Sequence, residues 1–369
     1  MIYVHVPFCH RKCSYCAFYS TAQRGGHDDY VAALVEEIEQ RRDEMPWPVK
    51  TLYFGGGTPS ILSIGELDTI ARALSRNFDL VGLEECTIEC NPEDLTDDYI
   101  KGLADTGLFN RLSIGIQSFD DTTLRTLNRR HNARQALDAI ASANKHGFSN
   151  ITIDLMYGLP GMSLDEWTDT CRTAAALPVT HISAYSLTLE PGTILDRQVA
   201  RGMVALPSDD VIVEQYHMLV DVLEEAGFEH YEISNFCRPG YASKHNSRYW
   251  TRTPYLGIGP GAHSFSLAGG GFGVRRWNKA DVADYISHHS YGEERLEEKD
   301  AYNEMLMTAL RTSRGIGADD IPERYKKRLN ADIQPYIGLG WIVADGGRYR
   351  PTAEGMLHAD GMAAALFVT

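Results

Sequence analysis

The sequence predicts an α/β protein: a partial (β/α)6 barrel of the TIM type, followed by a small C-terminal domain that is helical and winged-helix-like. Strand-like apolar runs alternate with helix-like periods six times in the first half of the chain. One face of these strands is polar, and the pattern changes to helices plus a hairpin after about residue 300. We therefore expect the barrel over residues 1–236, a connector over 237–299 and the C-terminal domain over 300–369.

Local patterns place the six strands and mark the start of two helices. The strands are predicted at residues 1–6, 49–54, 85–90, 111–117, 151–156 and 181–187. Ser63 is followed by Glu66, and Ser163 by Glu166, each before an apolar periodic stretch. Such a pair is a capping box, in which each side chain accepts from the backbone N–H of the other residue. Helices are therefore predicted to begin after both serines.

The predicted strands carry polar residues on one face. In residues 86–90, strand periodicity puts Cys86, Ile88 and Cys90 on one face and Thr87 and Glu89 on the other. The polar positions of the other strands are Tyr3, His5, Ser113, Gln117, Thr152 and Asp154. A parallel sheet covered on both sides is normally apolar on both faces. A repeated polar face thus predicts a barrel interior that holds water or a polar ligand.

The C-terminal part is expected to be helical with one hairpin. Helical periodicity covers residues 302–314 and 321–337, and residues 341–350 form two short strand patterns around Asp345 and Gly346. Helices plus a hairpin predict a winged-helix-like domain. Because the net charge of the chain is −15, covering the barrel or docking a partner is favoured over DNA binding.

The composition indicates a soluble cytoplasmic protein. The chain has 369 residues, 43% of them hydrophobic, and no apolar run long enough to span a membrane. Seven cysteines, an odd number without a secretory signal before them, favour a reducing compartment over a disulfide framework. The negative net charge argues against nucleic acid as a ligand.

Cys9, Cys13 and Cys16 form a CxxxCxxC run directly after the first predicted strand. Thiolates suit iron–sulfur clusters, and this spacing lets one loop hold three irons of a [4Fe–4S] cluster. The fourth iron would lack a protein ligand and would be open to a small molecule. The alternative is three buried or zinc-binding thiols, although zinc usually takes a fourth Cys or His and favours CxxC pairs.

The cysteine spacing and several further motifs resemble the radical S-adenosylmethionine (SAM) superfamily, in which the open iron binds the amino and carboxylate groups of SAM. Gly55-Gly-Gly-Thr-Pro59 is similar to the glycine-rich segment that holds the amino acid part of SAM. Thr58, in place of an acidic residue, is typical of the coproporphyrinogen oxidase-like branch. Other segments that resemble this branch are residues 3–9, 89–93, 115–118, 127–131 and 154–161.

The resemblance also implies which residues contact SAM. They are Tyr3, Tyr15, Gly56, Gly57, Thr58, Glu89, Gln117, Arg129, Asp154 and Ala184. The residue types suit this role, because a carboxylate such as Glu89 accepts hydrogen bonds from the polar groups of SAM. Arg129 is able to bind the SAM carboxylate with a fork of two N–H groups. No catalytic residue is assigned.

The segment Lys244-His-Asn-Ser-Arg-Tyr-Trp250 resembles a motif of the HemW family of heme chaperones within this branch. Imidazole is a common axial ligand of heme iron, and Tyr249 and Trp250 suit packing against a planar macrocycle. His245 is the first candidate for the iron ligand and His263 the second. The alternative is a structural lid, with His-Asn capping a turn and Tyr-Trp filling the core.

By this resemblance we expect a heme chaperone that carries a [4Fe–4S] cluster and SAM and passes heme to heme-requiring proteins, membrane-bound respiratory enzymes among them. Net radical chemistry is not required. The first alternative is oxygen-independent coproporphyrinogen III oxidase, but that enzyme has an N-terminal arm and a fourth cysteine two residues after the third, where this chain has Phe18. The second alternative is another radical SAM enzyme, such as a methyltransferase.

Overall fold

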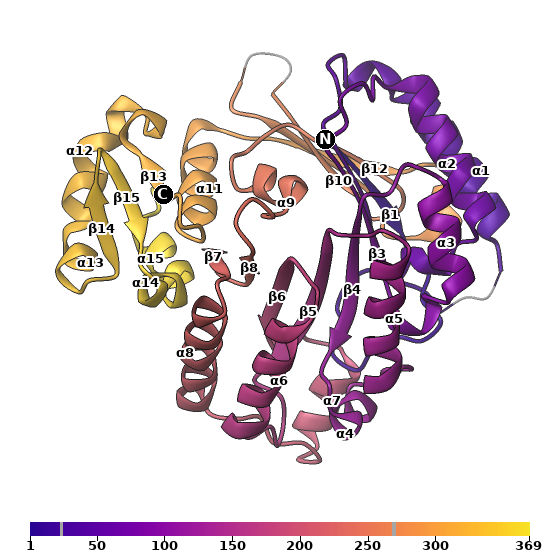
Figure 1. Ribbon diagram of the computed structural model, residues 1–369. Coiled ribbons are helices and arrows are strands. Elements are labelled where there is room, and N and C mark those ends of the chain that lie inside the picture. Colours follow the sequence, from indigo (N-terminus) through magenta and orange to yellow (C-terminus); the bar gives the residue numbers. More distant parts are fainter. Residues whose placement is uncertain (23–24, 268–270) are drawn as a thin grey trace.

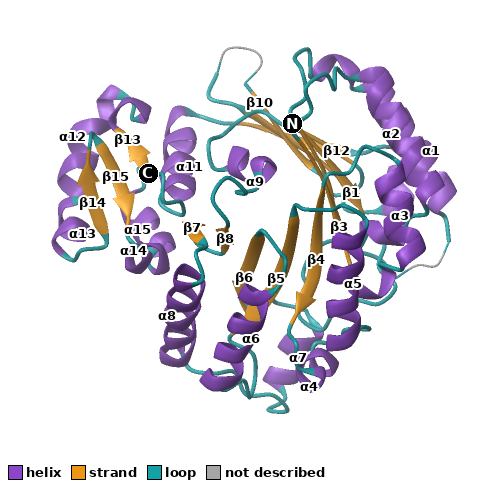
Figure 2. Ribbon diagram, in the orientation of Figure 1, coloured by secondary structure: helices purple, strands orange, loops and turns teal. Residues whose placement is uncertain are grey.

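A curved sheet of nine strands forms the larger part of the molecule (Figures 1 and 2). The computed structural model describes residues 1–22, 25–267 and 271–369. Six parallel strands are β1 (Ile2–Val6), β2 (Thr51–Gly56), β3 (Glu85–Cys90), β4 (Arg111–Gln117), β5 (Ile151–Tyr157) and β6 (His181–Ser186). They lie side by side in chain order. The six predicted strands are confirmed, with ends that differ by two residues at most.

Three shorter strands extend this sheet at its edges. Beside β1 lies β9 (Leu256–Ile258), which is parallel to it. Beside β6 lie β8 (Asn235–Cys237) and then β7 (Glu229–Glu232), which are antiparallel to their neighbours. The sheet is therefore an open, partial barrel, as the strand and helix pattern predicts.

Helices cover the outer face of the sheet (Figure 2). They are α1 (His27–Gln40), α2 (Ile64–Asn77), α3 (Asp97–Asp105), α5 (Ala133–Lys145), α6 (Leu164–Ala176) and α8 (Asp209–Glu225). The short helices α4 (Asp121–Thr126) and α7 (Ile194–Ala200) lie instead at the carboxyl end of the strands. Short 3-10 helices cover Arg42–Glu44, Pro59–Ile61 and Pro92–Asp94. The capping boxes of Ser63 with Glu66 and Ser163 with Glu166 are both present, and they start α2 and α6.

The strand alternation sorts the side chains as predicted. Cys86 and Ile88 are fully buried in the apolar core between the sheet and the helices. On the opposite face the polar side chains bond to one another across strands. The Tyr53 hydroxyl donates to Glu89 at 2.7 Å, and the Arg111 guanidinium donates to Thr152 at 2.5 Å. The barrel interior is polar for this reason.

The region that follows the barrel strands is folded. It contains α9 (Lys244–Tyr249), β10 (His263–Ser266), β11 (Val274–Asn278), α10 (Val282–Ser287) and β12 (Tyr291–Arg295), besides β9. The strands β10, β11 and β12 form a second, antiparallel sheet. One strand of the segment predicted as a connector thus joins the large sheet. The domain limits at residues 236 and 299 stay a prediction.

The C-terminal part has its own core. Its helices are α11 (Glu298–Ala309), a 3-10 turn (Ala318–Asp320), α12 (Glu323–Asp332), α13 (Gln334–Gly338), α14 (Ala353–Leu357) and α15 (Ala359–Leu366). Its small sheet has the order β13 (Ile316–Gly317), β15 (Arg348–Pro351) and β14 (Ile342–Asp345). The predicted hairpin is present, and Gly346 and Gly347 in its turn have φ of 53° and 76°. This arrangement is helical and winged-helix-like, as predicted.

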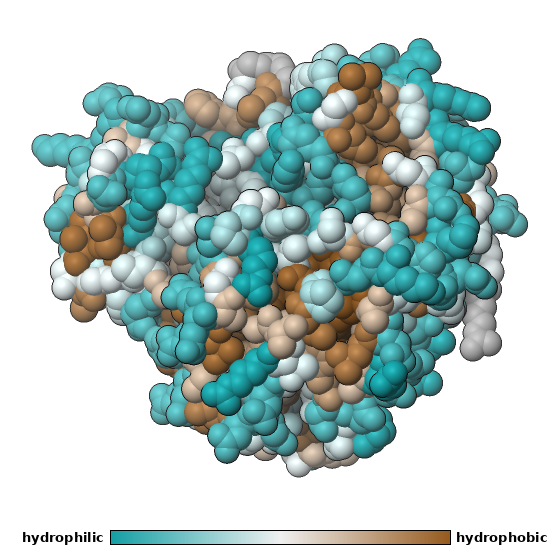
Figure 3. All heavy atoms as spheres, in the orientation of Figure 1, coloured by the Kyte–Doolittle hydropathy of each residue, from teal (hydrophilic) through white to brown (hydrophobic). Residues whose placement is uncertain are grey.

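The two parts meet beside β7. Ile233 N–H donates to the Arg311 carbonyl at 2.9 Å, and Ser313 N–H donates to the Tyr231 carbonyl at 3.0 Å. Hydrophilic residues cover most of the face in Figure 3, with apolar residues gathered near its centre. Within the described ranges, every helix is too short or too polar to cross a membrane.

Candidate functional site

The three cysteines of the CxxxCxxC run lie on one loop after β1, at the carboxyl end of the parallel strands. Backbone bonds between Cys9 and Thr21 and between Thr21 and Pro7, at 2.9 and 2.7 Å, close the loop at its base. Burial raises the pKa of Cys9 and of Cys16, and the neighbouring thiols act in the same direction. Among the described residues no three His, Cys, Asp or Glu side chains meet as a site for a single metal ion.

Arg129 places a positive charge against this loop. Its Nη1 donates to Cys13 Sγ at 3.4 Å, and its Nη2 donates to Asn91 Oδ1 at 2.7 Å and to the Gly115 carbonyl at 2.5 Å. Burial lowers its pKa, but Tyr15 and Cys13 outweigh this, so the pKa of Arg129 is raised. Its buried Nε has no hydrogen-bond partner among the described residues. A cation that touches one of the three thiols and keeps an N–H group without a partner suits an anionic ligand beside the loop.

The glycine-rich turn after β2 and the carboxylate of Glu89 face each other. Tyr53 Oη donates to Glu89 Oε1 at 2.7 Å, and Gly56 N–H donates to Glu89 Oε2 at 3.0 Å. Gly56 has a φ of 113°, and a Cβ there would lie 2.6 Å from the His5 ring, so only glycine fits. Burial raises the pKa of Glu89 to about 7, and Tyr53 opposes the rise.

Thr58 and Asn91 connect the turn, the cysteine loop and Arg129. The Thr58 hydroxyl donates to Cys9 Sγ at 3.4 Å and accepts from Asn91 Nδ2 at 3.2 Å. Asn91 also accepts from Arg129. Sequence reasoning missed Asn91 as a site residue. Its signal was present, because it is polar and directly follows a strand whose last inward residue is Glu89.

The other residues predicted to contact SAM lie at this end of the barrel or in its interior. The Tyr3 hydroxyl and His5 Nδ1 form a hydrogen bond of 3.0 Å in the barrel interior. Gln117 lies at a bulge between β4 and β5 with a φ of 71°. Burial raises the pKa of Asp154 to about 6, opposed by Arg111. Tyr15 lies close enough to Cys13 and Arg129 to share their electrostatic field.

Ala184 lies apart from this group. It is 1% exposed, and its side chain belongs to the apolar core on the helix side of β6. Its N–H donates to the Ser234 carbonyl at 2.7 Å. Strand parity explains the difference, because Ser183 is the inward residue beside Asp154.

His245, the first candidate for a heme ligand, is fully buried at the opposite end of the barrel from the cysteines. Its ring nitrogens are bonded to Thr51 Oγ1 at 2.9 Å and to Tyr249 Oη at 3.1 Å. Its N–H and that of Lys244 donate to the Glu85 carboxylate, at 2.8 and 3.0 Å. Burial lowers the pKa of His245 to about 3, so the ring is neutral. In this conformation it closes the barrel at this end.

The three remaining candidates differ in their exposure. Tyr249 is packed edge-on against Tyr255, with ring centroids 4.9 Å apart. Trp250 is half-buried. His263 on β10 is exposed and stacks on Trp277 with ring centroids 6.1 Å apart. Iron could reach His263 without breaking the barrel plug, whereas ligation by His245 would break one of its two ring bonds. The heme ligand stays a prediction.

Comparison with known proteins agrees with this geometry. The profile of the Radical SAM superfamily matches residues 3–174. A protein named heme chaperone HemW from Lactococcus lactis is 37% identical over 362 residues, which cover 96% of this chain and 93% of the relative. The chain belongs to the HemW family of radical SAM proteins. A HemW protein from Mycobacterium tuberculosis is 34% identical, covering 99% of this chain and 94% of the relative.

The fold is also that of a solved structure. Coproporphyrinogen III oxidase (HemN) from Escherichia coli, described as a radical SAM enzyme, superposes with a TM-score of 0.83 over 100% of this chain and 89% of that chain, at 23% identity. The profile of the HemN C-terminal domain matches residues 296–358. In this HemW-family chain the cysteine loop and Arg129 lie within the radical SAM match, whereas α9 lies between the two matched ranges.

The residues at the cysteine loop fit the [4Fe–4S] cluster and SAM that the radical SAM family implies. Three thiols of one loop would supply ligands to three irons of such a cluster. Arg129, with its unpartnered Nε, suits the SAM carboxylate, and Glu89 suits a donor group of SAM. A second arginine, Arg111, was missed by sequence reasoning. It is 1% exposed at the far end of the interior, where it bonds Thr87 and Thr152.

Proposed function

We propose that this chain is a cytoplasmic heme chaperone that binds heme and delivers it to heme-requiring proteins, with a [4Fe–4S] cluster and SAM as its resident cofactors. Cys9, Cys13 and Cys16 hold the cluster. When bound, the cluster and SAM together would allow one-electron chemistry. Alternatively, their binding would control the conformation of the surrounding residues. The HemW names of its relatives support the heme part of the proposal.

The observation that carries the cofactor part is the contact between Arg129 and Cys13. Burying a guanidinium removes its hydration, which is unfavourable unless an anion beside it compensates the charge. Arg129 holds the SAM carboxylate, Asn91 fixes the arginine, and Glu89 accepts from the amino acid or ribose part. These residues bind and orient SAM, and the glycine turn brings the backbone close to it.

The experiment is an anaerobic reconstitution followed by two titrations. We expect about four irons per chain, a change in the electron paramagnetic resonance spectrum on adding SAM, and a saturable Soret change on adding heme. Cys13→Ala should lose the cluster and keep heme binding. Cys171→Ala is the matched control, because Cys171 is a fully buried thiol on α6 and should keep both.

The same preparation separates the alternatives. Incubation with SAM, a reductant and coproporphyrinogen III should give no decarboxylated product. Phe18 occupies the position of the oxidase's fourth cysteine and is 73% exposed. Formation of the vinyl product would overturn the chaperone function. Zinc at the loop, or a chain that does not bind heme, would overturn it as well. SAM turnover with a non-porphyrin substrate and no heme affinity would indicate another radical SAM enzyme.

A further inference from the structure

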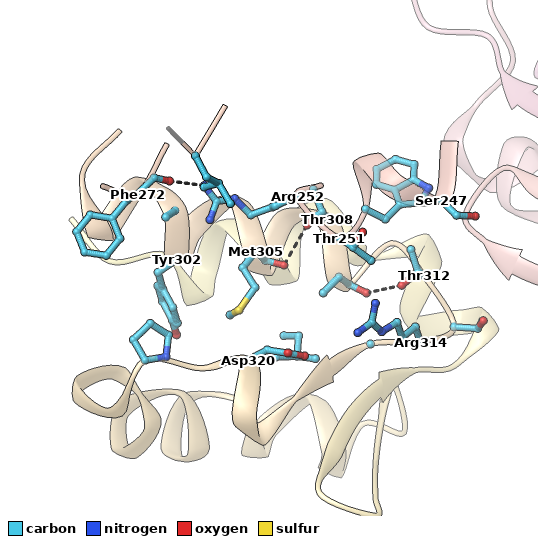
Figure 4. A pocket seen from close by; sticks show the side chains of 18 of the residues that line it. Ser247, Thr251, Arg252, Phe272, Tyr302, Met305, Thr308, Thr312, Arg314 and Asp320 are labelled. Carbon is cyan, nitrogen blue, oxygen red and sulfur yellow. Dashed lines mark hydrogen bonds between the residues drawn. The ribbon is translucent and has the colours of Figure 1, made fainter. Parts of the chain in front are cut away.

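A cavity of about 640 Å³ lies between the end of α9 and the C-terminal part (Figure 4). Its lining comes mainly from the α9 segment and the residues just after it, from α11 and from residues 312–322, and Tyr231, Leu267 and Phe272 complete it. Pockets that bury a ligand of drug size have volumes of about 300–1,000 Å³. The cavity is separate from the cysteine loop and from the predicted SAM residues, none of which lines it.

The α9 segment presents different residues to the barrel and to this cavity. His245 and Tyr249 bond each other on the barrel side, and His245 is bound to Thr51 on β2. Ser247 and Trp250 line the cavity. The histidine therefore fixes the helix, and the tryptophan supplies a flat apolar wall to the cavity.

The other walls combine apolar side chains with one free cation. Tyr302, Met305 and Ala309 on α11 contribute apolar surface. The guanidinium of Arg314 has no hydrogen bond or ion pair to another residue of the described chain, and Figure 4 shows it on one side of Met305 with Tyr302 on the other. A flat apolar ligand with carboxylates suits such a wall.

The acidic groups of the cavity are already paired. Glu298 lies 3.0 Å from Arg324. Asp320 accepts from Gly317 N–H at 3.0 Å and lies 3.6 Å from Arg348. Because these carboxylates are neutralised elsewhere, the unpaired charge at the cavity is positive. An anionic ligand is favoured.

Two further observations point to an unfilled binding site. The Met305 thioether projects from α11 into the cavity toward Asp320 (Figure 4). Trp250 Nε1 and Tyr302 Oη are buried without a hydrogen-bond partner among the described residues. A buried polar group without a partner costs about 1–3 kcal/mol. Both residues line the cavity, and these two polar atoms have no partner in the described part of the chain.

We propose that heme binds in this cavity, with Met305 as an axial ligand of the iron, Trp250 against the ring and Arg314 on a propionate. This inference rests on the proposed function and adds the site at which heme binds. A thioether is a known axial ligand of heme iron. In this arrangement His245 is a positioning residue that holds α9, and the macrocycle bridges the barrel and the C-terminal part.

The test is a titration of the full-length protein with ferric heme and with heme dimethyl ester, which lacks the propionate charges. Arg314→Ala should weaken heme binding about tenfold and leave the ester unchanged, as expected for one charged hydrogen bond. Arg350→Ala is the charge-matched control, because Arg350 is exposed on β15 and does not line the cavity.

Met305→Leu should change the axial-ligand signature in magnetic circular dichroism and weaken binding about tenfold. Met307→Leu, two residues away on α11 and 42% exposed, should change neither.

Each outcome decides the proposal. Leu is close to Met in volume, so Met305→Leu should fold normally. Wild-type spectra and affinity in both Met305→Leu and Arg314→Ala would overturn the cavity site. If His245→Ala or His263→Ala then abolished the signal, the heme function would stand at another site. A wild-type chain that binds no heme would overturn the site and the proposed function together.

Discussion

At the scale of single residues, Arg129 has the contacts that best define the candidate cofactor site. It bonds Cys13, Asn91 and Gly115 at once. Three fixed directions of hydrogen bonding require a planar guanidinium, which a lysine ammonium does not reproduce. We expect Arg129→Lys to keep the cluster and to lose about 1.5–3 kcal/mol of SAM affinity.

The measurement is a SAM titration followed by electron paramagnetic resonance on the reconstituted protein. Arg130→Lys is the control, because Arg130 is the exposed neighbour that lies 3.6 Å from Glu93. Equal SAM affinities in both variants would show that Arg129 supports the loop without contacting the ligand.

Gly56 tests the close packing around the glycine turn. Gly56→Ala would put a Cβ 2.6 Å from the His5 ring at a φ of 113°. Strain and overpacking together should cost about 2–4 kcal/mol of unfolding free energy. Gly107→Ala has a φ of 65° and open space, so it should cost only about 1 kcal/mol. Urea unfolding of the two variants separates the effect of the clash from that of the backbone strain. Equal losses of unfolding free energy would show that contact with the His5 ring does not restrict this position.

At the scale of elements, α9 is held by one buried carboxylate. Glu85 accepts from the first two N–H groups of the helix and lies 4.0 Å from the Arg111 guanidinium. Glu85→Gln removes the charge from these bonds, and we expect a loss of about 2–3 kcal/mol together with faster amide exchange in residues 244–250.

Glu84→Gln is the matched control for this helix. Glu84 pairs with Lys244 and Arg248 at 3.4 and 3.9 Å, but its side chain is 38% exposed. Surface ion pairs contribute about 0–1 kcal/mol, so the loss should be small. If Glu84→Gln had the larger effect, the surface pairs and not the buried carboxylate would hold α9.

The same helix shows where sequence reasoning stops. The six barrel strands, their polar face and the capping boxes follow from periodicity within a few residues, and the structure confirms them. Periodicity does not predict the environment of His245, because its partners Thr51 and Glu85 are 194 and 160 positions away in the chain. Residue types in a short motif identify a family, but burial of each side chain depends on such distant contacts.

At the scale of the whole molecule, the two ends of the barrel differ in structure. The cysteine loop, Arg129 and the glycine turn occupy the carboxyl end of the strands, whereas α9 closes the other end. Between them a row of rings fills the interior: Tyr3 and Tyr53 lie 6.1 Å apart, and Tyr53 and His245 lie 5.1 Å apart. The proposed heme cavity lies beyond this plug, so the cofactor end and the heme end are joined only through packed side chains.

The contact between the barrel and the C-terminal part contains a buried carboxylate that makes stability depend on pH. Glu232 on β7 is 1% exposed and pairs across a bridge with Thr312. Burial raises the pKa of Glu232 from 4.5 to about 7, although Asn235 opposes the rise. The unfolded side chain ionises above about pH 4.5, while the folded one keeps its proton until about pH 7. Its contribution to stability is therefore complete below pH 4.5 and is lost as the pH rises through 7.

Glu232→Gln replaces this carboxyl by a neutral group that still accepts from Asn235 and Ser234. Relative to the wild type, the variant should gain about 3 kcal/mol of unfolding free energy between pH 4.5 and pH 8. Urea unfolding at both pH values measures the gain. Glu229→Gln, on the same strand but exposed, should show none. A constant difference between variant and wild type across this range would mean that Glu232 is already ionised in the folded protein.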